Sequence, residues 1–391
     1  MGEGFKFLLD LALILLFANL GGYISRKLKQ PAVLGQIIAG LVIGPSVLNI
    51  VKETEFISYM AEIGVILLMF IAGLETDIDD LKSSSKSSAS VALGGVVFPL
   101  LLGFLAVKVM KPQSDITEGL FVGVILTATS VSITVQALRE MNRLRTKQGI
   151  AVLGAAIIDD VVGIILLTLV VGLINPTSGS GELFFVVGKI IVFFLLSIGL
   201  GMVFSKYLTR YKEFLSREDR VLVSALIFCF LAAFFAESLG VAAIIGAYFT
   251  GIVFSTTPHR NRVSFEVQKI AYSIFTPVFF VNIGLFVRLD DVGGNIGLTV
   301  VIIIAAILGK VIGCGLGAKL SHFNNREALQ ISIGMIPRAE VALIVTNLGV
   351  KIGVITKEVF ASIILLVLVS TIITPILLKI AYDDKPQHQT Q

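Results

Sequence analysis

Long apolar runs separated by short charged clusters dominate this chain of 391 residues. Most of the runs approach or exceed the roughly 20 residues with which an α-helix crosses the hydrocarbon core of a bilayer. The pattern predicts an all-α polytopic membrane protein with about 13 transmembrane helices. The predicted spans are residues 5–26, 31–47, 56–75, 87–110, 116–138, 146–173, 182–206, 220–237, 240–256, 265–287, 296–319, 327–350 and 357–380.

Composition supports this class. Hydrophobic residues make up 55% of the chain and charged residues only 15%, which is more apolar than the core of a soluble domain requires. The net charge of +4 is spread over many loops, so no nucleic-acid partner is predicted. The two cysteines lie in separate apolar segments and are interpreted as packing residues.

The distribution of basic residues predicts how the chain is oriented. With the N-terminus outside, 21 Lys and Arg fall in loops or near the ends of spans on one side of the membrane and 7 on the other, while three lie deep within spans. The side rich in Lys and Arg faces the cytoplasm, and so does the short tail 381–391. The basic cluster after residue 25 predicts that the first span is retained and is not a cleaved signal.

Matching glycine patterns indicate an internal repeat with an offset of 211 residues. The matched pairs are Gly35 with Gly246, Gly40 with Gly251, Gly73 with Gly284, and Asp79 with Asp290. The partners are seven spans apart, an odd number, so the two halves would cross the membrane in opposite directions. The sequence therefore predicts repeat A over about 5–173, a linker helix over about 182–206 and repeat B over about 220–380.

Both halves contain an interruption at corresponding places. Residues 127–132 bring hydroxyls into the fifth span, and Pro337 interrupts the twelfth span one residue before the repeat mate of Thr127. Paired interruptions indicate a binding site near the membrane midplane, so Thr127, Thr129 and Ser130 are candidate cation ligands. For each hydroxyl alone, packing between helices is an equally good interpretation.

Two adjacent carboxylates, Asp159 and Asp160, lie near the centre of the apolar segment 146–173. Charges at that depth are costly unless they are protonated, paired or facing water, so we interpret the pair as a cation and proton site. A structural salt bridge is the alternative. Lys310 is a lone cation halfway along its span, and these acids are its expected partners; the alternative is that its amine extends to the membrane surface. Burial disfavours charge on all three groups, so each is expected to exchange protons.

Three further charges lie within predicted spans. Arg338 and Glu340 are two residues apart, so on an intact helix they would face different sides and bond elsewhere. Glu62, in the third span, is a candidate partner of Arg338. We interpret these residues as structural charges of the core.

These features together resemble a known family. The chain resembles sodium/proton antiporters of the monovalent cation:proton antiporter-2 family, of the NapA and GerN type. The similar positions are residues 31–40, Gly44-Pro45, the Asp159-Asp160 pair, Lys310 and residues 334–340. The resemblance covers nearly all of the predicted spans. Relatives that export potassium often carry Gln-Asp at the position of the Asp-Asp pair.

The resemblance implies an NhaA/NapA-like fold with two crossed broken helices in a core domain, which moves as an elevator against a scaffold. It implies a homodimer in the cell membrane, in which Asp160 is the main Na⁺ and H⁺ ligand and Asp159 also takes part. Asp159 would pair with Lys310 when no ion is bound. No cofactor and no enzymatic reaction are predicted.

Three alternatives to electrogenic sodium/proton exchange remain. They are potassium/proton exchange, a cation channel that uses the same acids in a continuous pore, and a sodium-coupled solute symporter. The inverted repeat with broken helices favours alternating access over a channel.

Overall fold

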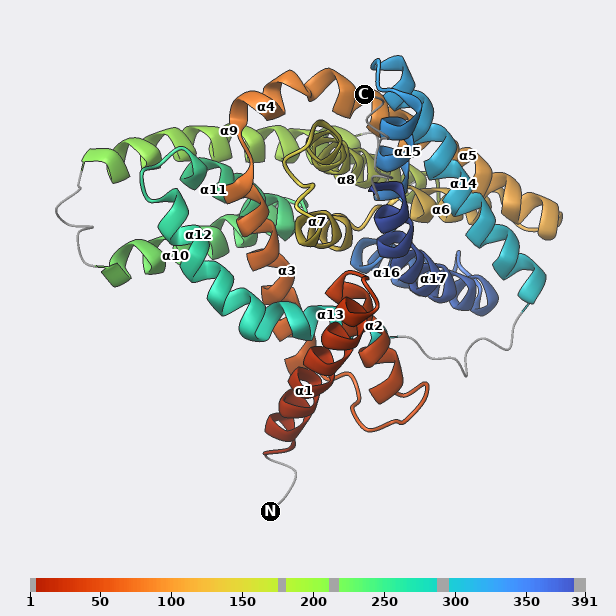
Figure 1. Ribbon diagram of the computed structural model, residues 1–391. Helices are drawn as coiled ribbons and strands as arrows, with labels where there is room; N and C mark the ends of the chain where they lie inside the picture. The colour runs from red at the N-terminus through yellow and green to blue at the C-terminus, as the bar shows by residue number, and fades with distance from the viewer. Residues whose placement is uncertain (1–4, 175–180, 211–217, 287–294, 383–391) are drawn as a thin grey trace, which may run out of the picture.

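A computed structural model describes residues 5–174, 181–210, 218–286 and 295–382, and this part of the chain is helical with no strand (Figure 1). The helices of the first half are α1 (Lys6–Lys27), α2 (Ala32–Ile43), α3 (Glu55–Glu75), α4 (Ile78–Ser83), α5 (Ser85–Met110), α6 (Ile116–Thr127), α7 (Val131–Glu140) and α8 (Lys147–Ile174). Those that follow are α9 (Gly181–Arg210), α10 (Glu218–Ser238), α11 (Ala243–Ser255), α12 (Arg260–Ile270), the π-helical turn η2 (Ala271–Phe275), α13 (Thr276–Leu285), α14 (Ile296–Leu320), α15 (Asn325–Gly334), α16 (Glu340–Lys351) and α17 (Lys357–Tyr382).

Each predicted span coincides with one of these helices or with consecutive helices. Eight helical segments of the described chain are long and apolar enough to cross a membrane, and shorter apolar helices accompany them. The two predicted interruptions are confirmed: α6 ends at Thr127 before α7 begins at Val131, and α15 ends at Gly334 before α16 begins at Glu340. The polytopic all-α class is therefore correct.

One irregularity was not expected. The predicted tenth span is α12, the π-turn η2 and α13 in succession. Pro277 stands in the first turn of α13 and has no backbone N–H, and its ring crowds the carbonyl four residues earlier. A π-turn widens the helix at this place, which accommodates the proline without ending the helix.

The helices pack as two groups. The scaffold group contains α1, α2, α3 and α10 to α13, in which α2 packs on α1 and α13, and α3 on α11 and α13. The core group contains α5 to α8 and α14 to α17, in which α5 packs along α14 and α8. Figure 1 shows α3 and α10 to α12 gathered on one side of α7 and α8, with α5, α6 and α14 to α17 on the other. The linker helix α9 contacts helices of both groups, α8 and α11 among them.

The packing repeats with the predicted offset of 211 residues. A Cβ atom on Gly73 of α3 would lie 2.1 Å from the carbonyl oxygen of Tyr248 in α11. Likewise, a Cβ atom on Gly284 of α13 would lie 2.4 Å from the carbonyl oxygen of Ile37 in α2. Gly284 follows Gly73, and Tyr248 follows Ile37, by 211 residues. The same close contact thus occurs twice with the halves exchanged, as an inverted repeat requires. The predicted match at 289–292 lies outside the described residues.

Three glycines hold α14 close to α5. Gly309, Gly313 and Gly317 repeat every four residues and therefore share one face of α14. A Cβ atom on Gly313 would lie 2.1 Å from the carbonyl oxygen of Gly94, so only a residue without a side chain fits. This close approach fixes the helix that carries Lys310 against the core group.

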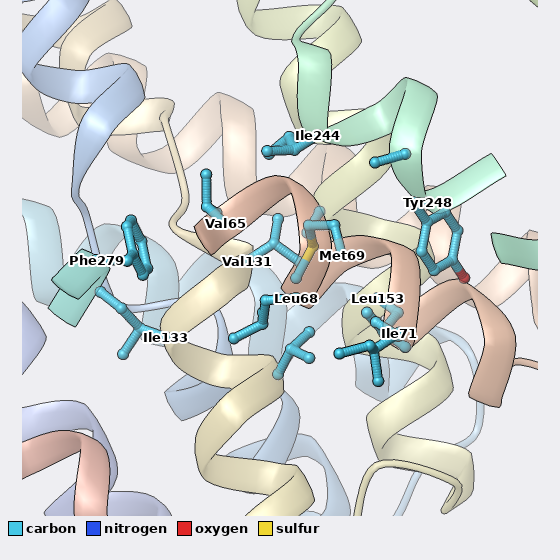
Figure 2. Packing of buried hydrophobic residues seen from close by; sticks show 14 of the residues in the cluster. Val65, Leu68, Met69, Ile71, Val131, Ile133, Leu153, Ile244, Tyr248 and Phe279 are labelled. Atoms are coloured by element: carbon cyan, nitrogen blue, oxygen red, sulfur yellow. The ribbon is translucent and has the colours of Figure 1, made fainter. Parts of the chain in front are cut away.

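The two groups meet over apolar side chains. Figure 2 shows residues of α3, including Leu68 and Ile71, packed among Val131 and Ile133 of α7 and Leu153 of α8. All five are nearly inaccessible to solvent. Dispersion contacts of this kind are not directional, so the surface can slide more readily than one held by hydrogen bonds.

The packing between the groups, at α2 and α17, differs at the two ends of the bundle. One end of the bundle, which we call the inner end, contains a cavity lined by Arg26, Glu140 and Tyr382. Toward the outer end, Leu41 of α2 packs against Ile364 and Leu368 of α17. The groups are therefore separated by a cavity at the inner end and joined by apolar contacts farther out.

Candidate ion-binding site

The two adjacent aspartates lie in the middle of α8, the long helix at the centre of the bundle. Asp159 is 2% exposed and Asp160 is 6% exposed. Residues on either side of them are apolar, so no residue of α8 within a turn offers a counter-charge. Partners must come from other helices, because burying two carboxylates without any would cost many kcal/mol.

Lys310 of α14 provides the counter-charge. Its Nζ lies 2.7 Å from Asp159 Oδ2, and both side chains are fully buried. The hydroxyl of Thr129, in the break between α6 and α7, donates to the same oxygen at 2.6 Å. The ion pair expected from the family resemblance is therefore present, and it joins α8, α14 and the first break.

The two breaks cross each other beside this cluster. The N–H of Ser130 donates to the carbonyl of Pro337 at 2.7 Å, so the extended segments between the half-helices touch. The hydroxyl of Thr134 in α7 donates to the carbonyl of Gly334, the last residue of α15, at 2.6 Å. Each contact satisfies a backbone group that an unbroken helix would have paired internally.

Arg338, in the second break, fills the centre of the crossing. Its guanidinium donates to the carbonyls of Leu126 in α6, Ile336 in the same break and Ala306 in α14, at 2.8 Å for Leu126 and 3.0 Å for Ala306. The side chain is completely buried. The C-terminal ends of helices carry partial negative charge, so this fixed cation stabilises the end of α6.

Arg338 does not pair with Glu62, so that prediction is wrong. Glu62 lies on an exposed face of α3, in the scaffold group. The two terminal nitrogens of Arg338 donate to backbone carbonyls instead, and the amino-acid sequence does not reveal such acceptors. Glu340 begins α16, and its side chain lies outside what the structure describes.

One of the three candidate hydroxyls, that of Thr129, contacts Asp159. Thr127 donates to the carbonyl of Val124 in its own helix, at 2.7 Å. The hydroxyl of Ser130 lies 3.1 Å from that of Ser132. All three candidates are buried, but only Thr129 has a hydrogen bond to a carboxylate among the described residues.

Several residues that make room for the site or hold it in place were not expected from the sequence. A Cβ atom on Gly95 of α5 would lie 3.4 Å from Lys310 Nζ and 2.6 Å from the sulfur of Cys314, so this glycine leaves space for the lysine. The hydroxyl of Thr371 donates to the Arg338 carbonyl at 2.9 Å, and the Arg338 N–H donates to Ser370 at 3.2 Å. The regular spacing of glycines on the face of α14 toward α5 was the one feature of the sequence that indicated close packing around the site.

Replacing Arg338 with glutamine is expected to destabilise the fold. The substitution removes a buried cation from the ends of the half-helices and leaves buried carbonyls with fewer donors, and each lost hydrogen bond to a charged group costs about 1.5–3 kcal/mol. The measurement is thermal unfolding of the detergent-purified protein. Arg145→Gln, at an exposed position, is the matched control and should unfold at the parent temperature. An unchanged melting temperature for Arg338→Gln would show that the hydrogen bonds of Arg338 to the backbone carbonyls do not stabilise the fold.

Chemically, the site combines two acids, one base and unwound backbone. Carboxylate, hydroxyl and carbonyl oxygens are ligands that a small monovalent cation can exchange for water. Asp159 Oδ1 has no hydrogen-bond partner among the described residues, so the paired aspartate keeps an oxygen for a further ligand. A proton can occupy the same oxygens, so both kinds of ion can be held there in turn.

Comparison with known proteins agrees with this arrangement. Residues 12–382 match the family described as sodium/hydrogen exchanger, transmembrane. The chain is similar to the Na⁺/H⁺-K⁺ antiporter GerN of Bacillus cereus, at 39% identity over 97% of each chain. It is also similar to the Na⁺/H⁺ antiporter of Enterococcus hirae, at 35% identity over 96% of this chain and 97% of that one.

Solved structures show the same fold. The sodium proton antiporter MjNhaP1 from Methanocaldococcus jannaschii superposes with a TM-score of 0.74 at 19% identity, covering 99% of this chain and all of that one. A second structure of that antiporter, at pH 8, gives a TM-score of 0.68. From the family match and the identities to its relatives, the chain belongs to the sodium/hydrogen exchanger family of transmembrane proteins.

Proposed function

We propose that this protein exchanges Na⁺ for H⁺ across the cell membrane by alternating access, with the carboxylates of Asp159 and Asp160 as the shared site. The observation that carries the proposal is the buried ion pair between Lys310 and Asp159 beside two crossed helix breaks. A structural salt bridge alone would not need a second acid next to it. Relatives over the whole chain are named as antiporters of these ions.

Competition provides the coupling. A monovalent cation at Asp160 displaces its proton, and a cation close to Asp159 competes with the ammonium group of Lys310. The core can reorient when either ion is bound, whereas an empty and charged site resists passage through the apolar interface between the groups. Sodium and protons then cross in opposite directions because they do not occupy the site together.

The motion we propose is an elevator displacement of the core group against the scaffold group. The interface in Figure 2 is lined with apolar side chains from both groups, which favours sliding as a rigid body. In this proposal the present arrangement is the one open to the cytoplasm, which is supported by the cavity at the inner end and by the apolar contact of Leu41 with α17 farther out. In this proposal the halves 5–173 and 220–380 exchange their arrangements when the site faces outward.

Potassium is the second candidate cation. The relative GerN, named as a Na⁺/H⁺-K⁺ antiporter, shares 39% identity with this chain. The proposal also includes a homodimer, an external N-terminus and a cytoplasmic C-terminus, which the excess of basic residues in alternate loops supports.

Reconstitution tests the function. Purified protein in liposomes with an imposed inside-acid gradient should release protons when Na⁺ is added outside, and should accumulate Na⁺ above its external concentration. Lithium, potassium and rubidium are compared side by side. A channel would let Na⁺ equilibrate along its own gradient but would not drive uphill accumulation, so downhill flux alone would overturn the proposal.

Thr129→Val is expected to weaken apparent cation affinity by about tenfold while maximal rate is largely kept. The hydroxyl contributes one hydrogen bond to a charged carboxylate, which corresponds to roughly 1.5–3 kcal/mol, and the backbone carbonyls of the break remain. The measurement is the Na⁺ dependence of proton flux.

Thr127→Val is the matched control, because that hydroxyl bonds within its own helix. Its apparent affinity should stay within about twofold of the parent, since only a weak local bond is lost. Complete loss of transport in Thr129→Val with no change of affinity would show that the crossing is misplaced relative to the site.

A further inference from the structure

A cavity of about 880 Å³ lies at the inner end between the two groups of helices. The scaffold side is lined by residues of α1, α2, η2 and α13, and the core side by residues of α7, the segment after it and α17. Pockets of this size hold organic ligands, whereas a single monovalent cation needs far less space. Neither aspartate of the transport site lines it.

The charged residues that line this cavity are mostly basic. Arg26 and Lys29 stand on the scaffold side, Arg143 and Lys379 stand on the core side, and Glu140 is the acidic residue among them. The carboxylate of Glu140 accepts hydrogen bonds from the backbone N–H of α2 and from a glutamine of α7, so it is held at the wall. Basic residues repel the Na⁺ that the protein is proposed to carry, so the passage of the cation does not account for the positive charge of this cavity.

A buried donor also faces the cavity. Thr276 of α13 lines it, and its side chain is 1% exposed. Among the described residues its hydroxyl has no hydrogen-bond partner. A buried hydroxyl is usually paired, so an oxygen-bearing ligand in the cavity would satisfy it. Charge and hydrogen bonding thus indicate the same ligand chemistry, an anion rich in oxygen.

We propose that this cavity binds a phosphate-bearing anion, which bridges basic residues of the scaffold group and of the core group. Arginine and lysine are the residues that bind phosphate oxygens, and here they come from both walls. A bridging anion holds the groups in the present arrangement and therefore slows exchange. The expected slowing of exchange rests on the proposed transport cycle, whereas the expected binding of the anion does not.

The test measures binding and transport separately. Inorganic pyrophosphate is titrated into the detergent-purified full chain, with binding heat and melting temperature as readouts. The double variant Arg26→Gln/Lys29→Gln is compared with Lys82→Gln/Lys86→Gln, an equal loss of charge at exposed positions outside the cavity. Lys379→Gln removes one charge from the opposite wall, so the test does not depend on correct folding of the double variant. Each cavity variant should bind pyrophosphate at least about tenfold more weakly than the control, since each lost charged contact is worth about 1.5–3 kcal/mol.

Flux in liposomes distinguishes the sources of phosphate. Pyrophosphate should lower Na⁺-dependent proton flux in neutral phosphatidylcholine liposomes if the ligand is a soluble anion. Liposomes containing phosphatidylglycerol should lower it without pyrophosphate if the ligand is a lipid headgroup. In either case the cavity variants should resist inhibition and the control should not.

Some outcomes would overturn the inference. Equal pyrophosphate binding by cavity and control variants, together with equal response to phosphatidylglycerol, would show that the cavity is no anion site. Binding without any effect on flux would refute the bridging role. Absence of Na⁺-dependent flux from the unmodified protein would instead refute the proposed function, and the binding measurement would still decide whether the site exists.

Discussion

Asp160→Asn is expected to reduce sodium-dependent proton flux to the level of liposomes without protein, while the protein still folds. The substitution removes a titratable ligand with almost no change in volume, at a position 6% exposed in the centre of α8. An amide can neither carry the exchanged proton nor neutralise a cation, so both halves of the cycle fail. Flux and melting temperature are measured on the same preparation.

Asp10→Asn is the matched control for this variant. Asp10 of α1 is also a buried aspartate, 5% exposed, but it belongs to the scaffold group. Exchange should persist in that variant because it leaves the carboxylate pair intact. Near-normal flux in Asp160→Asn would refute the assignment of the site, whereas loss of flux in both variants would indicate a general sensitivity to buried acids.

Local chemistry made the helix breaks predictable. Pro337 has no backbone N–H, and the run of hydroxyls from Thr127 offers the backbone competing hydrogen bonds. The repeat offset of 211 residues brings these two signals to corresponding positions of the two halves. Glycine matches such as Gly73 with Gly284 were predictable because only glycine permits the close backbone contacts that both halves contain.

The partners of the buried charges were only partly predictable. Lys310 and Asp159 could be matched because few charges lie within apolar spans, and an intramembrane cation needs an anion. Arg338 was matched wrongly with Glu62 because its actual acceptors are backbone carbonyls. Every residue has such a carbonyl, so the sequence does not show which ones are left unpaired where two broken helices cross.

The inner cavity could not be predicted from the sequence, for a different reason. Its basic residues are far apart in the chain, and each one also contributes to the excess of charge expected on a cytoplasmic face. Only the packing of α1 and α2 opposite α7 and α17 gathers Arg26 and Lys379 around one space. The basic residues that orient a membrane protein and those that build a binding site are of the same types, and only their positions in the folded structure differ.

Lys310→Gln is expected to remove the dependence of exchange on membrane potential. In the proposed cycle, a cation displaces one proton from Asp160 and breaks the pair of Asp159 with Lys310, which lets the lysine release a second proton. Two protons then exchange for one cation, and one net charge crosses in each cycle. A potential contributes roughly 2.3 kcal/mol per 100 mV to such a step, so voltage should drive the unmodified protein strongly.

The measurement imposes a potassium diffusion potential with valinomycin on sodium-loaded liposomes and follows the sodium-dependent pH change. Glutamine at position 310 cannot carry a proton, so an active variant should approach one-for-one exchange and respond equally with and without the potential. Lys189→Gln is the matched control, because Lys189 lies within α9, and its amine contacts the ring of Phe185. That variant should keep the voltage response. If the potential does not change exchange by the unmodified protein, the two-proton cycle is contradicted, because no net charge then crosses. Competition of sodium and protons for the aspartates would still account for exchange.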